Sequence, residues 1–149
     1  MSPSPSPAYI DPRGPRFGAA VTTVVVAIVL ITGNGWLLAA QTVVFAIGAL
    51  SGLKYAPYGY LYRALVRPHL AKPTELEHAA PPTFAQTVGF FFGAIGAIGY
   101  LTGVTVLGLV FTALTFAAAF LNAVFDYCMG CETYLLFRRG TVRRRPVGP

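Results

Sequence analysis

The chain has 149 residues, a length typical of one domain, and 55% of them are hydrophobic while only 11% are charged. A soluble domain carries about 25% charged residues, so this composition argues against an ordinary water-soluble enzyme and indicates a protein of the lipid bilayer. The net charge of +6 is compatible with binding to nucleic acid or to anionic lipid. The positions of the charges decide between these two partners.

The first sixteen residues form a tail that opens with alternating serine and proline. Ser2–Pro7 is of low complexity, and we expect residues 1–16 to be disordered. No small-residue cleavage site follows the first apolar stretch, so the sequence does not predict a cleavable signal peptide.

Four apolar stretches without Asp, Glu, Lys or Arg follow, at residues 17–32, 36–53, 84–101 and 104–125. A helix needs about 20 apolar residues, within a range of about 17–25, to cross a bilayer. The first stretch has only 16 residues, so its helix must extend slightly or lie where the bilayer is thin. We therefore predict an all-α integral membrane protein, with four transmembrane helices in a membrane domain over residues 17–139.

Short uncharged breaks join these helices in pairs. Gly33-Asn34-Gly35 and Thr102-Gly103 each predict a tight turn at the tip of a helical hairpin. The two hairpins are joined by a longer polar loop over residues 54–83.

The eleven basic residues are confined to three segments outside the apolar stretches, and the hairpin tips carry none. Four crossings put all three segments on one side, and Lys and Arg collect on the cytoplasmic side. We therefore predict a multi-pass protein of the cell (inner) membrane with both termini in the cytoplasm. Each charge near the surface attracts anionic lipid by about 1 kcal/mol, and nucleic-acid binding is not expected. The basic residues are Arg13, Arg16, Lys54, Arg63, Arg67, Lys72, Arg138, Arg139, Arg143, Arg144 and Arg145.

The two halves of the chain resemble each other, which predicts an internal repeat. Each half would contain two membrane helices and a short helix at the cytoplasmic interface, related by an axis along the membrane normal. The matching segments are Pro15-Arg16-Phe17 with Pro82-Thr83-Phe84, Thr32-Gly33 with Thr102-Gly103, and Pro57-Tyr58-Gly59 with Cys128-Met129-Gly130.

Glycines four residues apart allow helices to approach closely in lipid. They predict close packing either within one chain or between copies in a homo-oligomer. The pairs are Gly48/Gly52, Gly89/Gly93 and Gly99/Gly103.

The chain has two cysteines, and they form the motif Cys128-Met-Gly-Cys131 just after the fourth stretch. The predicted topology places them in the cytoplasm, where thiols are kept reduced, so a permanent disulfide is not expected. Asp126 could cap a helix with Cys128 in its first turn, which favours the thiolate. The negative charges of Asp126 and Glu132 oppose it.

Three interpretations of the cysteine pair stay open. In a redox or sulfur-handling dithiol, Cys128 is the attacking or sulfur-carrying thiolate and Cys131 resolves the intermediate. A metal site would need His69 and His78 as further ligands, but their spacing fits no compact ligand pattern and solvated loop histidines are the default, so no metal is predicted. The third interpretation is two small apolar side chains packed at the interface.

Polar residues inside the predicted helices are further candidates. Asn122 lies one turn before Asp126 at the inner end of the last helix, where the pair could bond to a neighbouring helix or shape the thiol site. Gln41 is placed midway along the second helix. Polar groups within the membrane are functional candidates, although a single Gln more often joins two helices.

Five segments form one further pattern: Ile10–Phe17, Tyr58-Gly59, Arg67-Pro68, Asn122–Phe125 and Cys128–Glu132. Together they resemble a family of small actinobacterial membrane proteins known only as a domain of unknown function. The resemblance covers nearly the whole chain after the tail, and the Cys-x-x-Cys-Glu ending is its most specific part. It implies a four-helix membrane protein and, through the genes that accompany the family, a thioredoxin-like or sulfurtransferase partner.

A looser similarity, at the level of fold, connects the chain to four-helix sulfur and thiol oxidoreductases that use a quinone. A quinone is therefore the cofactor to consider, although no residue demonstrates a site for it. The leading hypothesis is a cytoplasm-facing membrane thiol protein. The alternatives are a non-enzymatic anchor that recruits partners through the basic tail at residues 140–149, and a small transporter subunit.

Overall fold

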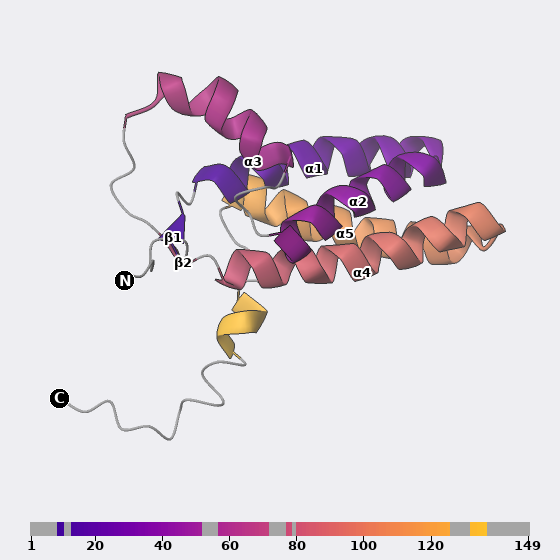
Figure 1. Ribbon diagram of the computed structural model, residues 1–149. Helices are drawn as coiled ribbons and strands as arrows, with labels where there is room; N and C mark the ends of the chain where they lie inside the picture. Colours follow the sequence, from indigo (N-terminus) through magenta and orange to yellow (C-terminus); the bar gives the residue numbers. More distant parts are fainter. Residues whose placement is uncertain are drawn as a thin grey trace.

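The computed structural model describes residues 9–10, 13–51, 57–71, 77–78, 80–125 and 132–136 (Figure 1). Its main elements are four long helices that run side by side as two antiparallel hairpins. They are α1 (Arg13–Thr32), α2 (Gly35–Ser51), α4 (Ala80–Thr102) and α5 (Thr105–Phe125). We call the end of the bundle with Arg13, Ser51, Ala80 and Phe125 the base, and the end with Gly33 and Gly103 the tip.

Within the described residues, three helices are long and apolar enough to cross a membrane: Arg13–Thr32, Pro82–Thr102 and Thr105–Phe125. The apolar helix α2 has 17 residues, about 25 Å at 1.5 Å per residue, and is shorter than these three. Large apolar side chains point away from the bundle, such as Ile31 at 84% exposed and Leu50 at 87% exposed. A surface of this kind suits lipid rather than water, so the fold is that of a helical membrane protein.

Two helices begin earlier than the sequence analysis predicted. Helix α1 begins at Arg13 rather than at residue 17, and α4 begins at Ala80 rather than at residue 84. Pro15 and Pro82 stand in the first turns, where the backbone N–H groups have no helical partner and proline is tolerated. The apolar stretches are therefore shorter than both helices. Residues 13–16 are helical, although we expected them to be part of a disordered tail.

A short strand pair precedes the two hairpins at the base. Strand β1 (Tyr9–Ile10) pairs antiparallel with β2 (Glu77–His78), with Tyr9 opposite His78 and Ile10 opposite Glu77. These are the two strands of the described residues, and they are an addition to the predicted all-α fold.

The segment after the first hairpin is helical but irregular. It consists of α3 (Pro57–Leu61), a π-helical turn η3 (Tyr62–Val66) and a 3₁₀ turn η4 (Arg67–His69). A helical segment is therefore present where the sequence predicts a short helix after the first hairpin, and α3 packs against α1. The corresponding helix of the second half is helical over residues 132–136.

Both hairpin tips are closed by a glycine in the left-handed region, as the sequence predicts. Gly33 has φ 68° and its N–H donates to the carbonyl of Val29 over 2.7 Å, which ends α1. The side-chain oxygen of Asn34 accepts from the N–H groups of Trp36 and Leu37 over 3.0 and 3.1 Å, which caps α2. Gly103 has φ 91° at the other tip.

Glycines of α4 provide the space into which side chains of α2 and α5 pack. A methyl group at Gly89 would lie 3.0 Å from the ring of Phe45, and one at Gly99 would lie 2.6 Å from the backbone nitrogen of Gly108. Gly93 faces Thr42 in the same way. Close packing of Gly89, Gly93 and Gly99 is therefore found within one chain. Gly103, in the turn, has no side chain or backbone near its Cβ position among the described residues, and Gly52 lies outside them.

Threonines inside the helices satisfy their own hydroxyl groups. In the cases given below, the hydroxyl donates to the carbonyl four residues earlier in its helix, so no second helix is needed to pair it in lipid. The donors are Thr23, Thr32, Thr42, Thr87, Thr102, Thr112 and Thr115.

The Gly99→Ala variant should be less stable than the wild type, because the added methyl group meets backbone that can move only if α4 and α5 separate. We expect a loss of about 1–3 kcal/mol, as for other overpacked sites. Thermal unfolding in detergent measures it. Gly14→Ala is the matched control, since its methyl group would lie an ordinary 3.6 Å from the Tyr62 ring. Equal melting temperatures for the two variants would contradict the packing described here.

Candidate functional site

The cysteine motif is best located through the described residues on either side of it. Cys128, Cys131 and Asp126 fall in residues 126–131, outside the described residues. Asn122 is half-buried in the last turns of α5, and the exposed Glu132 opens the helical residues 132–136. The predicted first-turn position of Cys128 therefore stays a prediction.

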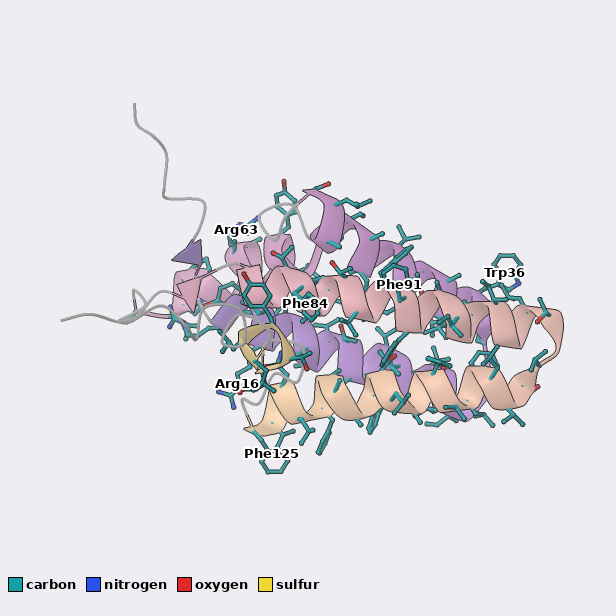
Figure 2. All side chains as sticks on the ribbon, turned by 90° about the horizontal axis from the view of Figure 1, so that it is seen from below. Arg16, Trp36, Arg63, Phe84, Phe91 and Phe125 are labelled. Atoms are coloured by element: carbon teal, nitrogen blue, oxygen red, sulfur yellow. The ribbon has the colours of Figure 1, made fainter. Side chains whose placement is uncertain are left out.

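Arg16 of α1 caps the end of α5, from which the chain continues to Cys128. Its Nε donates to the carbonyl of Ala123 over 3.2 Å, and its Nη2 donates to the carbonyl of Val124 over 3.4 Å. Carbonyls in the last turn of a helix lack helical partners, and a cation there complements the negative end of the helix dipole. Figure 2 shows Arg16 and Phe125 at the same end of the bundle, the base.

The residues after the motif contact a different helix. The rings of Tyr134 and Phe84 are tilted by 50° with their centroids 5.8 Å apart, an arrangement typical of aromatic pairs. Because Phe84 lies near the start of α4, residues 132–136 also lie at the base. The described residues before the motif thus lie beside α1, and those after it lie beside α4.

A second polar cluster lies inside the bundle around Gln41, which is 2% exposed. The hydroxyl of Tyr58 donates to Gln41 Oε1 over 2.5 Å, and Gln41 Nε2 donates to the hydroxyl of Thr22 over 3.4 Å. The pKa of Tyr58 lies above its ordinary value, because burial raises it more than the hydrogen bond to Gln41 lowers it. Gln41 thus joins α2 to both α1 and α3.

The sequence identified Gln41 but not its partner, because Tyr58 stood out only as part of the repeated segment Pro57-Tyr58-Gly59. A signal was present in the spacing: Gly14 and Gly18 stand four residues apart and face Tyr62 and Tyr58, which are also four apart. Small residues that recur with the period of a helix mark the place where another helix packs.

Tyr100 is a polar residue that the sequence analysis missed. Its ring packs on Gly108, and its hydroxyl is buried without a hydrogen-bond partner in the described parts of the chain. It lies near the tip, far along α4 from the base.

The metal interpretation gains no ligands from the described residues. His69 is exposed on η4, and His78 belongs to β2. No three or more His, Cys, Asp or Glu side chains gather within the described residues. The two cysteines that such a site would need lie outside them.

Residues 10–139 match a family described as a domain of unknown function (DUF4395). The chain belongs to this family. The resemblance seen in the sequence is therefore confirmed at the level of the family, which carries no established activity. No curated protein and no solved structure matches the chain.

Two tyrosine variants of this DUF4395 protein should differ in stability. Tyr58→Phe removes the donor to Gln41 and leaves a buried acceptor unpaired, so we expect a loss of about 1–3 kcal/mol. Tyr100→Phe removes a hydroxyl without a described partner and keeps the ring over Gly108, so we expect no loss or a slight gain. Thermal unfolding of both variants in detergent checks this. A Tyr100→Phe variant that is less stable than Tyr58→Phe would overturn the assignment.

Proposed function

We propose that this protein is a membrane thiol protein that acts at the cytoplasmic surface through Cys128 and Cys131. The proposal rests on the positions of the described residues just before and just after the motif. The end of α5, capped by Arg16, and Tyr134, packed on Phe84, both lie at the base of the bundle. A dithiol that follows a membrane helix at this end is accessible to a soluble partner and close to the bilayer.

Four crossings with the base in the cytoplasm are part of this proposal. Although α2 is short, methyl groups on Gly35 and Gly48 would touch Tyr100 and Gln86, so α2 packs along most of α4. A helix that accompanies a membrane-spanning partner in this way supports a fourth crossing. The basic residues of the base then select the cytoplasmic side.

The contacts between the helices support the proposed repeat. Helix α1 contacts α2 and α5, and α4 contacts the same two helices. The order around the bundle is therefore α1, α2, α4, α5. A twofold axis along the bundle would exchange α1 with α4 and α2 with α5, as two parallel copies of one hairpin require.

The proposed chemistry is thiol–disulfide exchange. The thiolate of Cys128 attacks a disulfide of the partner, forms a mixed disulfide and releases one partner thiolate, which takes up a proton. The thiolate of Cys131 then attacks the sulfur of Cys128 and releases the second partner thiol. The partner disulfide is reduced by two electrons, and the pair in this protein is oxidised to a disulfide. A thioredoxin-like protein is a partner of the required chemical class.

The Cys131→Ser variant should trap the partner, because the mixed disulfide on Cys128 can no longer be resolved. We expect a covalent adduct on a non-reducing gel that disappears with reductant. The Cys128→Ser/Cys131→Ser double variant is the control and should show none. A membrane-impermeant maleimide should label the wild type in inside-out vesicles but not in intact cells. No adduct, together with unchanged growth of both single variants, would refute the thiol function and favour an anchor.

Arg16 should support the reactivity of the motif. The C-terminal end of α5 is negative and disfavours a thiolate nearby, and the guanidinium offsets this effect. Four residues span at most about 14 Å, so Cys128 cannot be far from Val124. We expect Arg16→Gln to slow alkylation of Cys128 by iodoacetamide about two- to fivefold.

Arg13→Gln is the matched control for this measurement, because Arg13 Nη2 donates to the carbonyl of Ala71 on a different segment. It should leave the alkylation rate close to that of the wild type. If both variants slow the reaction equally, the effect comes from the overall charge of the base rather than from the cap on α5.

A further inference from the structure

A pair of aromatic rings at the base occurs twice, once in each half of the chain. Phe17 is the fifth residue of α1, and Phe84 is the fifth residue of α4. The rings of Phe17 and Tyr62 are tilted by 49° with their centroids 5.9 Å apart. The rings of Phe84 and Tyr134 are tilted by 50° with their centroids 5.8 Å apart. The same contact therefore joins the segment that follows each hairpin to the first helix of that hairpin.

In the first half, this ring pair helps to fix residues 57–71, which we call the arm. Tyr62 is 3% exposed, so its ring is enclosed by protein. The arm has further contacts with α1, such as the hydrogen bond of 3.0 Å from the side chain of Arg13 to the carbonyl of Ala71. Loss of the Phe17 ring therefore leaves the arm attached to α1 at other points.

In the second half, Phe84 gives the ring pair a rigid support. Two residues after it, Gln86 lies against α2, where a methyl group on Gly48 would come 2.8 Å from Gln86 Oε1. Three residues further, a methyl group on Gly89 would come 3.0 Å from the ring of Phe45. Close contacts with α2 therefore hold this part of α4 in place, and Figure 2 shows Phe84 at the base beside the short helical segment.

The segment that Tyr134 joins to α4 begins directly after the second cysteine of the motif. The Cα atoms of neighbouring residues are about 3.8 Å apart, so the position of Cys131 follows that of Glu132. A disulfide requires its two Cα atoms to lie within about 4.4–6.8 Å, whereas three residues of extended chain span up to about 11 Å. Cys131 can therefore resolve a mixed disulfide on Cys128 only when the chain between them is held in a compact form.

We propose that the Phe84–Tyr134 pair positions Cys131 for the resolving step, an inference that rests on the proposed thiol function. Joining the segment after the motif to α4 restricts the positions open to the Cys131 sulfur, and this raises the fraction of molecules in which it attacks Cys128. Arg16 acts before the motif, where it favours the thiolate for the first step. The two steps of the exchange thereby depend on different helices, α1 for the attack and α4 for the resolution.

Both steps can be followed with dithiobis(nitrobenzoate), an aromatic disulfide, added in one equivalent to the reduced full-length protein in detergent. The thiolate of Cys128 attacks the S–S bond of the reagent, forms a mixed disulfide and releases the first thionitrobenzoate. The thiolate of Cys131 then attacks the Cys128 sulfur and releases the second. The reagent gains two electrons, the cysteine pair becomes a disulfide, and both thiol protons pass to the buffer. The first phase of absorbance is faster at higher concentration, whereas the second is intramolecular and independent of concentration.

Phe84→Leu should slow the second phase about two- to tenfold, as the ordinary strength of an aromatic pair implies. Its first phase should stay close to that of the wild type. Phe17→Leu removes the equivalent ring of the first half and is the matched control, so both of its phases should stay close to those of the wild type. Phe84→Tyr keeps a ring against Tyr134 and should resolve the mixed disulfide as the wild type does.

The ratio of the two rates separates positioning from a general loss of structure, which would slow both phases. The double variant Phe84→Leu/Tyr134→Leu should be no slower in the second phase than Tyr134→Leu alone, because the two substitutions remove one and the same contact. Equal second phases in the wild type and Phe84→Leu would overturn the positioning role and leave the thiol function in place, and so would an equal slowing by Phe17→Leu. A wild type without a concentration-independent second phase would overturn the thiol function and the positioning role together.

Discussion

A bilayer offers no water to its polar groups, and this constraint explains much of the structure. Polar groups within the apolar layer are therefore paired by the chain itself, with the buried Tyr100 hydroxyl as an exception among the described residues. Threonines donate to their own helices, and Gln41 bonds to Thr22 and Tyr58. Arg16 pairs the carbonyls at the end of α5, at the border with the headgroups. The arrangement of α3 against α1 follows, because Tyr58 reaches Gln41 only from that position.

Attraction between the helices depends on close contact, since lipid removes the hydrophobic drive that packs a soluble core. Glycines on α4 let α2 and α5 approach until side chains touch backbone. The large side chains that remain outside contact lipid instead. The result is a small bundle whose interior is rich in glycine and threonine, while much of its leucine and isoleucine faces outward.

Much of this fold could be predicted from the sequence. Four apolar helices, two tight tips and a helix after the first hairpin followed from hydropathy and from glycine spacing, and the family was recognised from short motifs. The start of α1 was missed because the apolar stretch ends at the charge of Arg16, whereas the helix continues to Arg13. The start of α4 was missed because Pro82 and Thr83 interrupt the apolar stretch, whereas the helix begins at Ala80. The Tyr58–Gln41 bond and the cap by Arg16 join residues distant in sequence, and no local pattern reports such contacts. The position of Cys128 relative to a helix start stays a prediction.

The strand pair between β1 and β2 has a consequence for assembly. It joins the residues before α1 to the residues before α4, so the first hairpin and the arm form a closed circuit of chain. Arg13 closes the same circuit a second time through Ala71. A neighbouring copy that took over α1 and α2 while α3 stayed in place would have to open both contacts. The two contacts therefore oppose domain swapping of α1 and α2 alone.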